Sequence, residues 1–152
     1  MADLEGSKTL EIEAPIDRCF AIAADVANAP RWQGVMASAK VLEEDGHGRP
    51  SLVESDIDVS VRKVTVQLRF RYDEPDGMQW TRESGDLRSL DGSWRFVALD
   101  DDRTEAKYAL DIGLGRGLSM FAKTVRGPAR SKVRELLADR AVEGLKREAE
   151  RP

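Results

Sequence analysis

The sequence has little of the side-chain chemistry on which many enzymes and metal sites depend. It contains one cysteine, Cys19, and one histidine, His47. A single cysteine excludes an intramolecular disulfide, and a single histidine excludes metal sites built from several histidines. Cys19 lies on an expected helix without a nearby histidine, and His47 stands between two glycines in an expected turn. Neither residue is therefore expected to be reactive, and we expect no metal and no cofactor.

Long apolar runs and an excess of basic residues are also missing. No stretch approaches the roughly 18 apolar residues that a membrane-spanning helix needs. Residues 1–6 have neither the basic region nor the apolar run of a signal peptide. The net charge of -4 makes DNA a poor candidate partner. We expect one cytoplasmic domain over residues 1–152, ordered from about 7 to 149, as a monomer or a homodimer.

The spacing of the apolar residues that are present predicts an α+β domain. Apolar residues alternate with polar ones most clearly over 63–72, as is typical of a half-buried strand. The same period predicts strands over 7–14, 37–44, 51–61, 63–72, 78–84, 87–99 and 103–114, with Asp91–Gly92 as a turn or bulge. A period of three to four predicts a helix over 15–26, an interruption at 28–30, a helical turn at 30–34 and a helix over 118–145, kinked at Gly127–Pro128.

Weak local patterns spread over nearly the whole chain, from about residue 7 to 148. They are Ala14-Pro15-Ile16, Phe20, Ala24-Asp25, Pro30, Trp32, Trp80, Gly85-Asp86, the run 92–96 and the closing run 145–150. In this order they resemble the START-like, SRPBCC or helix-grip superfamily, especially its polyketide cyclase/dehydrase and coenzyme Q-binding branch. The resemblance implies a curved antiparallel sheet around a long C-terminal helix, with two short helices after the first strand. It also implies an apolar cavity between sheet and helix.

The face of the predicted sheet that turns toward the helix carries the candidate ligand-binding residues. Large apolar side chains dominate this face, and the same set could instead fill a packed core. Trp32 is expected to border the cavity mouth or to plug one end of the sheet. The ligand-binding candidates are Trp32, Phe70, Tyr72, Trp80, Arg82, Trp94, Phe96, Tyr108, Phe121 and Val125.

The catalytic candidates are Arg82, Tyr72 and Tyr108. Counting by two from Trp80 places Arg82 on the inner face, and Ser55 joins it from another strand. An interior guanidinium must pair with an acid, reach solvent or bind oxygens of a ligand. In a cyclase, such donors would stabilise an enolate as charge develops. The alternative is an arginine at a strand end that extends into solvent.

Three functions are compatible with these observations. The first is binding or transport of a hydrophobic small molecule, such as a lipid, a quinone or a polyketide-like compound. The second is an aromatase/cyclase-type enzyme. The third is an interaction module that uses the segment from Arg116 to Arg134, which contains basic residues and no acidic ones. That segment could contact a membrane surface or RNA, although a solvated helix face is the commoner reason for such a pattern.

Overall fold

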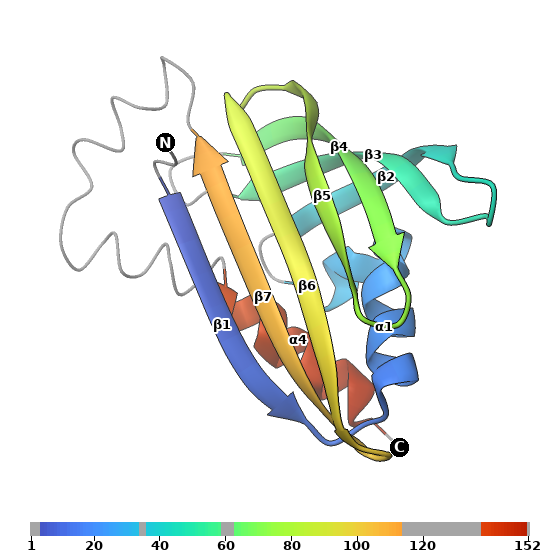
Figure 1. Ribbon diagram of the computed structural model, residues 1–152. Coiled ribbons are helices and arrows are strands. Elements are labelled where there is room, and N and C mark those ends of the chain that lie inside the picture. Colours follow the sequence, from blue (N-terminus) through green and yellow to red (C-terminus); the bar gives the residue numbers. More distant parts are fainter. Residues whose placement is uncertain (1–3, 34–35, 59–62, 114–137, 152) are drawn as a thin grey trace, which may run out of the picture.

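The computed structural model describes residues 4–33, 36–58, 63–113 and 138–151 and confirms the α+β fold (Figure 1). The described strands form one curved antiparallel sheet in the order β1-β7-β6-β5-β4-β3-β2. From β2 to β7, strands that follow one another in the sequence are neighbours, and β1 pairs with β7 at one edge. The strands are β1 (Leu4–Ile12), β2 (Met36–Glu44), β3 (Pro50–Asp58), β4 (Lys63–Asp73), β5 (Gly77–Gly85), β6 (Ser89–Asp100) and β7 (Arg103–Gly113).

The helices α1 (Ile16–Ala24), η1 (Val26–Arg31, a 3-10 helix) and α4 (Arg140–Ala149) lie on the inner face of the sheet (Figure 1). Helix α1 packs against α4, and η1 packs against β2. Helix α4 overlaps the predicted C-terminal helix over residues 140–145 and continues beyond it to Ala149. The rest of that prediction, including the kink at Gly127–Pro128, falls outside the described residues. No helix in the described part of the chain is long and apolar enough to cross a membrane.

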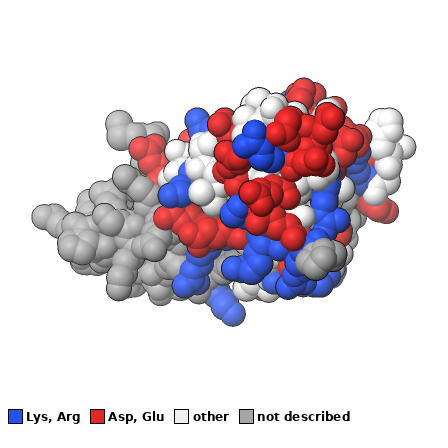
Figure 2. Space-filling model, turned by 90° about the horizontal axis from the view of Figure 1, so that it is seen from below, with Lys and Arg blue, Asp and Glu red and all other residues white. Residues whose placement is uncertain are grey.

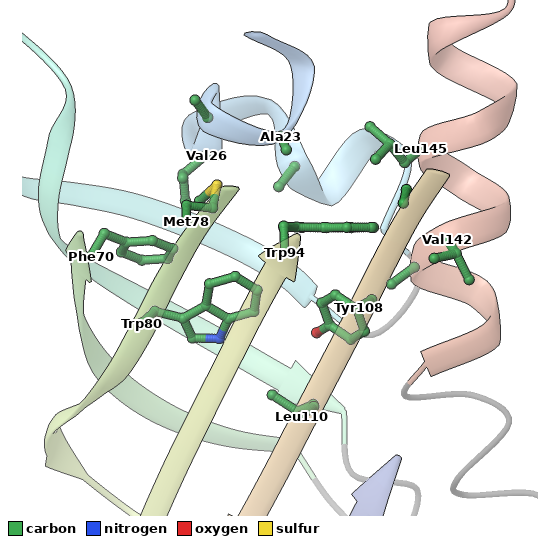
Figure 3. Packing of buried hydrophobic residues seen from close by; sticks show 14 of the residues in the cluster. Ala23, Val26, Phe70, Met78, Trp80, Trp94, Tyr108, Leu110, Val142 and Leu145 are labelled. Atoms are coloured by element: carbon green, nitrogen blue, oxygen red, sulfur yellow. The ribbon is translucent and has the colours of Figure 1, made fainter. Parts of the chain in front are cut away.

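The core fills the space between the inner face and the helices (Figure 3). In β4 the predicted alternation is confirmed, because Val64, Val66, Leu68 and Phe70 are buried while the residues between them are exposed or half-buried. The helices contribute mainly small and aliphatic residues, with Phe20 as the exception. Burial of apolar surface at about 25 cal/mol per Å² makes this layer the main source of stability. The helix residues in it are Cys19, Phe20, Ala23, Ala24, Val26, Ala29, Ala141, Val142, Leu145 and Ala149, and Ala138 lies just before α4.

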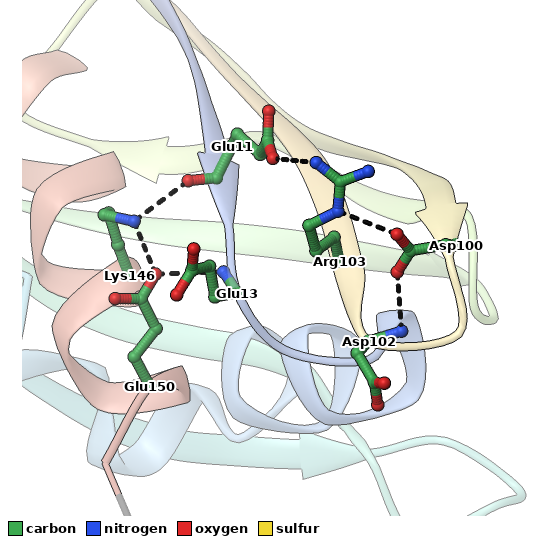
Figure 4. Close-up of polar contacts among 7 residues, drawn as sticks. All are labelled: Glu11, Glu13, Asp100, Asp102, Arg103, Lys146 and Glu150. Atoms are coloured by element: carbon green, nitrogen blue, oxygen red, sulfur yellow. Dashed lines mark hydrogen bonds and ion pairs between the residues drawn. The ribbon is translucent and has the colours of Figure 1, made fainter.

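Polar contacts fasten the C-terminal end of α4 to β1 and to the segment that follows it (Figure 4). Lys146 Nζ donates to the Glu11 carbonyl oxygen at 3.1 Å, and Glu13 N–H donates to Glu150 Oε2 at 2.9 Å. The Arg18 guanidinium of α1 donates to the Ala149 carbonyl oxygen at 2.7 Å. This bond satisfies one of the carbonyls that a helix leaves free at its C-terminus.

The predicted interruption at residues 28–30 is wrong, because the helical break falls at Asp25. The Asn28 side chain donates to Asp25 Oδ2 at 2.7 Å, and Asn28 N–H donates to the Asp25 carbonyl oxygen at 3.1 Å. These bonds start η1 at Val26, so Pro30 lies inside the 3-10 helix and not between two helices.

The predicted turn or bulge at Asp91–Gly92 is also wrong. Strand β6 pairs with β7 without a register shift from Ser89 to Ala98. Gly92 lies opposite Trp80 of β5, and a Cβ atom at position 92 would come within 2.2 Å of the Trp80 indole. The glycine therefore leaves room for a ring from the next strand and does not mark a change in chain direction.

Candidate functional site

An apolar hollow lies on the inner face of the sheet, beside the segment that joins η1 to β2. About 20 Å³ of it can take the centre of a water-sized sphere, within about 300 Å³ of space that includes open solvent. A volume of 20 Å³ holds about one water molecule, so a larger guest requires side chains to move. Its described lining consists of Gln33, Met36, Ile57, Leu68, Trp80, Leu90, Tyr108 and Leu110.

Sheet register brings the aromatic part of this lining together. Trp80, Gly92 and Leu110 lie opposite one another across β5, β6 and β7. Because Gly92 has no side chain, the Trp80 indole extends over β6 toward Tyr108, and the centroids of the two rings are 5.8 Å apart. Figure 3 shows Trp80, Tyr108 and Leu110 grouped on the inner face of these strands. Phe70 stacks on the other side of Trp80 at 5.6 Å.

Gln33 and Tyr108 form a buried polar pair in the hollow. Gln33 Nε2 donates to the Tyr108 hydroxyl oxygen at 3.2 Å, and both side chains are buried. Burial raises the pKa of Tyr108 well above its usual value, against a smaller lowering by the Gln33 hydrogen bond. The hydroxyl therefore keeps its proton, and no acceptor for that proton occurs among the described residues. Sequence analysis missed Gln33, because it lies outside any regular element and no periodicity marks its orientation.

Arg82 and Ser55 lie on the inner face, where alternation placed them. Arg82 of β5 lies opposite Leu68 of β4, and its Nη2 donates to the Gly85 carbonyl oxygen at 3.0 Å. Its Nε is buried without a hydrogen-bond partner in the described structure, as is the hydroxyl of the fully buried Ser55. Buried polar atoms without partners destabilise a fold by about 1–3 kcal/mol each. Both atoms thus keep hydrogen-bonding capacity that the described residues do not use.

Tyr72 lies away from the hollow. Its hydroxyl donates to the Pro50 carbonyl oxygen at 2.6 Å, and its ring contacts Phe20 with centroids 6.5 Å apart. The Arg49 guanidinium lies 5.5 Å from the ring centroid. Burial raises the pKa of Tyr72, so this hydroxyl also stays protonated. Its one proton is already used within the protein, in contrast to that of Tyr108.

Trp32, Trp94 and Phe96 fill the space between the sheet and α4. The ring centroids of Trp32 and Trp94 are 6.2 Å apart, and those of Trp94 and Phe96 are 5.7 Å apart. The backbone of Trp32 touches α4 so closely that a Cβ at Gly144 would lie 2.1 Å from the Trp32 carbonyl oxygen. Trp32 is thus buried against α4 directly after η1, and its expected role at a cavity mouth or as a plug stays a prediction. The candidates Phe121 and Val125, like the basic segment from Arg116 to Arg134, lie outside the described residues.

Larger hollows on the outer face of the sheet have a different character. One of about 630 Å³ is lined by Glu5, Ser7 and Asp111 together with small residues of β1 and β7. Another, of about 540 Å³, is lined mostly by charged and polar side chains of β4, β5 and β6. Such surfaces are open to water and offer little apolar area to a ligand. Figure 2 shows the molecule from below the view of Figure 1, and on this side too acidic and basic side chains lie next to one another. The inner hollow is therefore the better candidate site.

The two residues of potentially reactive type are placed as expected. Cys19 is fully buried, and burial raises the pKa of its thiol, so it stays protonated. His47 is exposed in the β2–β3 hairpin, where its backbone N–H donates to Asp45 Oδ1. The described residues also contain no group of three or more His, Cys, Asp or Glu that could hold a metal ion. The chemistry available in the hollow is thus hydrogen bonding and apolar contact.

Solved structures similar to this chain share its fold over almost the full length. A START superfamily protein from Mycobacterium smegmatis is 22% identical with a TM-score of 0.78, covering 96% of this chain and 97% of its own. The protein TTHA0849 from Thermus thermophilus is 18% identical with a TM-score of 0.76, covering 95% and 96%. The Zhui aromatase/cyclase from Streptomyces sp. R1128 is 22% identical with a TM-score of 0.70, covering 97% and 93%. At these identities the similarity establishes the fold alone.

Sequence comparison gives the family. No curated protein matches the chain significantly. The family model described as "Polyketide cyclase / dehydrase and lipid transport" matches residues 12–138, which is most of the chain and includes the whole sheet apart from β1. The match confirms the resemblance drawn from the order of local patterns, and the protein belongs to the polyketide cyclase/dehydrase and lipid transport family.

Proposed function

We propose that this protein binds a hydrophobic small molecule in the inner-face hollow. The observation that carries the proposal is the composition of the lining, in which six of eight described residues are apolar side chains or tryptophan and the polar groups are limited to Gln33, Tyr108 and the indole N–H of Trp80. Ligand sites typically combine such an apolar wall with a few polar groups that fix orientation. Membership in a family whose description includes lipid transport supports the same function.

The size of the hollow fits a ligand that displaces side chains on entry. The part of the hollow that a water-sized sphere can enter, about 20 Å³, is far smaller than the roughly 300–1,000 Å³ of small-molecule sites, so a ligand has to displace side chains. Met36 is half-buried at one wall, and unbranched methionine side chains adapt their shape at little cost. Each Å² of apolar ligand surface removed from water would contribute about 25 cal/mol. Affinity would thus come mainly from burial, and selectivity from the polar pair.

Extraction of the purified protein tests this proposal. Mass spectrometry of an organic extract is expected to reveal a lipophilic compound in near-stoichiometric amount. Leu90→Phe narrows the hollow and is expected to reduce the bound compound severalfold, because the larger ring occupies ligand space. Leu42→Phe adds the same ring at an exposed position of β2 and should leave the amount unchanged. An empty extract, together with failure to bind added apolar probes, would contradict the proposal.

Arg82 favours a second candidate, an aromatase/cyclase-type activity. Its buried Nε lacks a partner in the described structure, and a guanidinium on the inner face could stabilise an enolate oxygen. Turnover of a linear polyketone by the wild type is then expected to fall at least tenfold in Arg82→Ala. Arg95→Ala removes an exposed arginine from the opposite face of the sheet, on β6, and serves as the control. Equal turnover by Arg82→Ala and the wild type would rule out this role.

The interaction-module hypothesis depends on the segment from Arg116 to Arg134 and stays a prediction, as do the cytoplasmic location and the oligomeric state. Binding to anionic vesicles or RNA through this segment should weaken as salt is raised, because such contacts release counterions. Neutralising Arg126 and Arg130 should weaken it further. Vesicle and RNA binding that responds neither to salt nor to these substitutions would contradict this hypothesis.

A further inference from the structure

We propose that the ligand carries a neutral acceptor oxygen, such as a ketone or quinone carbonyl, that the Tyr108 hydroxyl binds, and that Gln33 positions this hydroxyl. The inference rests on the proposed function, because it names the chemical class that the same hollow selects. Its starting observation is that the pair has more donor hydrogens than the protein uses: Gln33 Nε2 donates to Tyr108, and the Tyr108 proton has no described acceptor.

The tyrosine is held in place by its neighbours. Its ring lies 4.8 Å from the Trp94 centroid and 5.8 Å from that of Trp80. Trp94 is also its direct neighbour across β6 and β7, so packing restricts rotation of the side chain. The position of the hydroxyl oxygen is therefore fixed before a ligand arrives. Fixed donors lose little conformational entropy on binding.

The glutamine is held by backbone hydrogen bonds on both sides. Its N–H donates to the Ala29 carbonyl oxygen at 2.8 Å, and its own carbonyl oxygen accepts from Met36 N–H at 3.2 Å. The side chain is 6% exposed, so its amide is largely removed from water. By occupying one acceptor site of the Tyr108 oxygen, the amide directs the hydroxyl proton elsewhere.

The charge of the lining favours a neutral oxygen over an anion. None of the eight described lining residues carries a charge. An isolated carboxylate in such surroundings loses much of its hydration without an ion partner. Arg82, the inner-face arginine, is absent from the described lining and donates to the Gly85 carbonyl oxygen. A carbonyl group instead keeps a hydrogen bond in the hollow without this loss of hydration.

Two probes of nearly the same shape test the inference. 1-Tetralone carries a ketone oxygen, and tetralin is the corresponding hydrocarbon. We expect the wild type to bind 1-tetralone about three- to tenfold more tightly than tetralin, the ratio for one neutral hydrogen bond in a buried site. Titrations followed by tryptophan fluorescence give both dissociation constants, since Trp80 lines the hollow. Tyr108→Phe should bring the ratio to about one and leave tetralin binding unchanged.

The other tyrosine of the chain provides the matched control. Tyr72→Phe removes a hydroxyl that is bound to the Pro50 carbonyl oxygen, so the preference for 1-tetralone should persist. The carbonyl stretching frequency of bound 1-tetralone is a second readout. It should be lowered in the wild type and in Tyr72→Phe, and raised toward its free value in Tyr108→Phe. Gln33→Leu should broaden this band and reduce the preference, with tetralin binding retained.

The outcomes separate this inference from the proposed function. If the wild type binds both probes equally, or if Tyr108→Phe keeps both the preference and the lowered frequency, the inference is wrong and the hollow remains a hydrophobic site. If neither probe binds and the organic extract is empty, the proposed function fails, and this inference fails with it. Tyr108→Phe and Gln33→Leu are compared only after circular dichroism shows the wild-type fold. The frequency in Tyr72→Phe is a further check, because loss of the shift there would overturn the role given to Tyr108.

Discussion

The two ends of the inner face differ in whether all of their described buried polar side chains are hydrogen-bonded. At the closed end, where α1 and α4 cover the sheet, the buried Thr104 Oγ1 donates to the Ala14 carbonyl oxygen at 2.8 Å, and the more exposed Arg18 and Lys146 donate to backbone carbonyls. At the hollow end, around the lining described above, Ser55 Oγ and the Arg82 Nε have no partner in the described structure. At the closed end, the described buried polar side chains form hydrogen bonds that stabilise the fold. At the hollow end, two buried polar atoms lack such a bond.

This difference explains how one small sheet can both hold its helices and admit a ligand. Unused donors lower the free energy of unfolding, and the protein tolerates them where a guest can supply the missing acceptor. Trp32, Trp94 and Phe96 form a chain of ring contacts on the inner face, and Trp32 contacts α4 at Gly144. Four substitutions test this comparison, and they are given in order from the largest expected effect to the smallest.

Gly144→Ala tests how tightly the closed end is packed. In an exposed helix, glycine to alanine raises stability by up to about 1 kcal/mol. Here the new methyl group would meet the Trp32 carbonyl oxygen at 2.1 Å, so we expect the free energy of unfolding to fall by about 3 kcal/mol. Urea denaturation measures the change. Gly46→Ala, in a turn with nothing within 4 Å, is the control and should stay within about 0.5 kcal/mol of wild type. Increased stability of Gly144→Ala would refute the close contact.

Thr104→Val removes a satisfied hydroxyl from the closed end. The substitution keeps the shape of the side chain but leaves the buried Ala14 carbonyl without this donor. We expect a loss of about 2 kcal/mol in the free energy of unfolding. Thr9→Val, at an exposed position of β1, gives the baseline for the same chemical change. Equal effects of the two substitutions would show that the Thr104 hydrogen bond contributes nothing.

Ser55→Ala removes an unsatisfied hydroxyl from the hollow end. Because the Ser55 hydroxyl is fully buried without a described partner, its loss should raise the free energy of unfolding by about 1 kcal/mol. The opposite signs expected for Thr104→Val and Ser55→Ala express the contrast between the two ends. Thermal and urea denaturation of the ligand-free protein measure it. A loss in Ser55→Ala as large as that in Thr104→Val would remove the contrast.

Glu150→Gln tests the contribution of the Glu150 carboxylate at the closed end, through the pH dependence of the free energy of unfolding. Burial raises the pKa of Glu150, but hydrogen bonds from Lys146 and Glu13 N–H outweigh it and hold the pKa below its ordinary value of 4.5. A lowered pKa contributes stability that is present above pH 4.5 and is lost as pH falls through the folded-state value. Glu150→Gln should therefore be less stable than wild type at about pH 7 and lose less on acidification. Parallel stability curves from about pH 7 to about pH 3 would contradict this.

Sequence patterns predicted on which face of the sheet a side chain lies better than they predicted whether the space opposite that side chain is filled. Alternation in β4 and β5 placed Phe70, Trp80 and Arg82 on the inner face, because the side-chain period of a strand is fixed at two. Alternation does not report whether the volume opposite a residue is filled. Trp94 belongs to a filled layer and Trp80 to the wall of the hollow, although both are inner-face tryptophans on neighbouring strands.

The remaining errors and omissions also have physical reasons. Gly92 suggests a bulge when the strand is considered alone, and its actual role depends on the Trp80 ring of the next strand. The break at Asp25 depends on a side-chain hydrogen bond from Asn28, which apolar spacing does not detect. Gln33 belongs to the predicted helical turn at 30–34, but η1 ends at Arg31, so its orientation is set by the backbone that follows the helix. These features arise from particular side-chain and backbone contacts, which the periodicity of one element does not encode.

Nuclear Overhauser effects between bound 1-tetralone and methyl groups test the central account most directly, because they locate the ligand on one end of the inner face. The account predicts contacts from the aromatic protons of the ligand to methyl groups of Ile57, Leu68 and Leu110 at the hollow end. It predicts none to Val142 and Leu145, which are fully buried in α4 at the closed end. Contacts to Val142 and Leu145 without any to the hollow would contradict it.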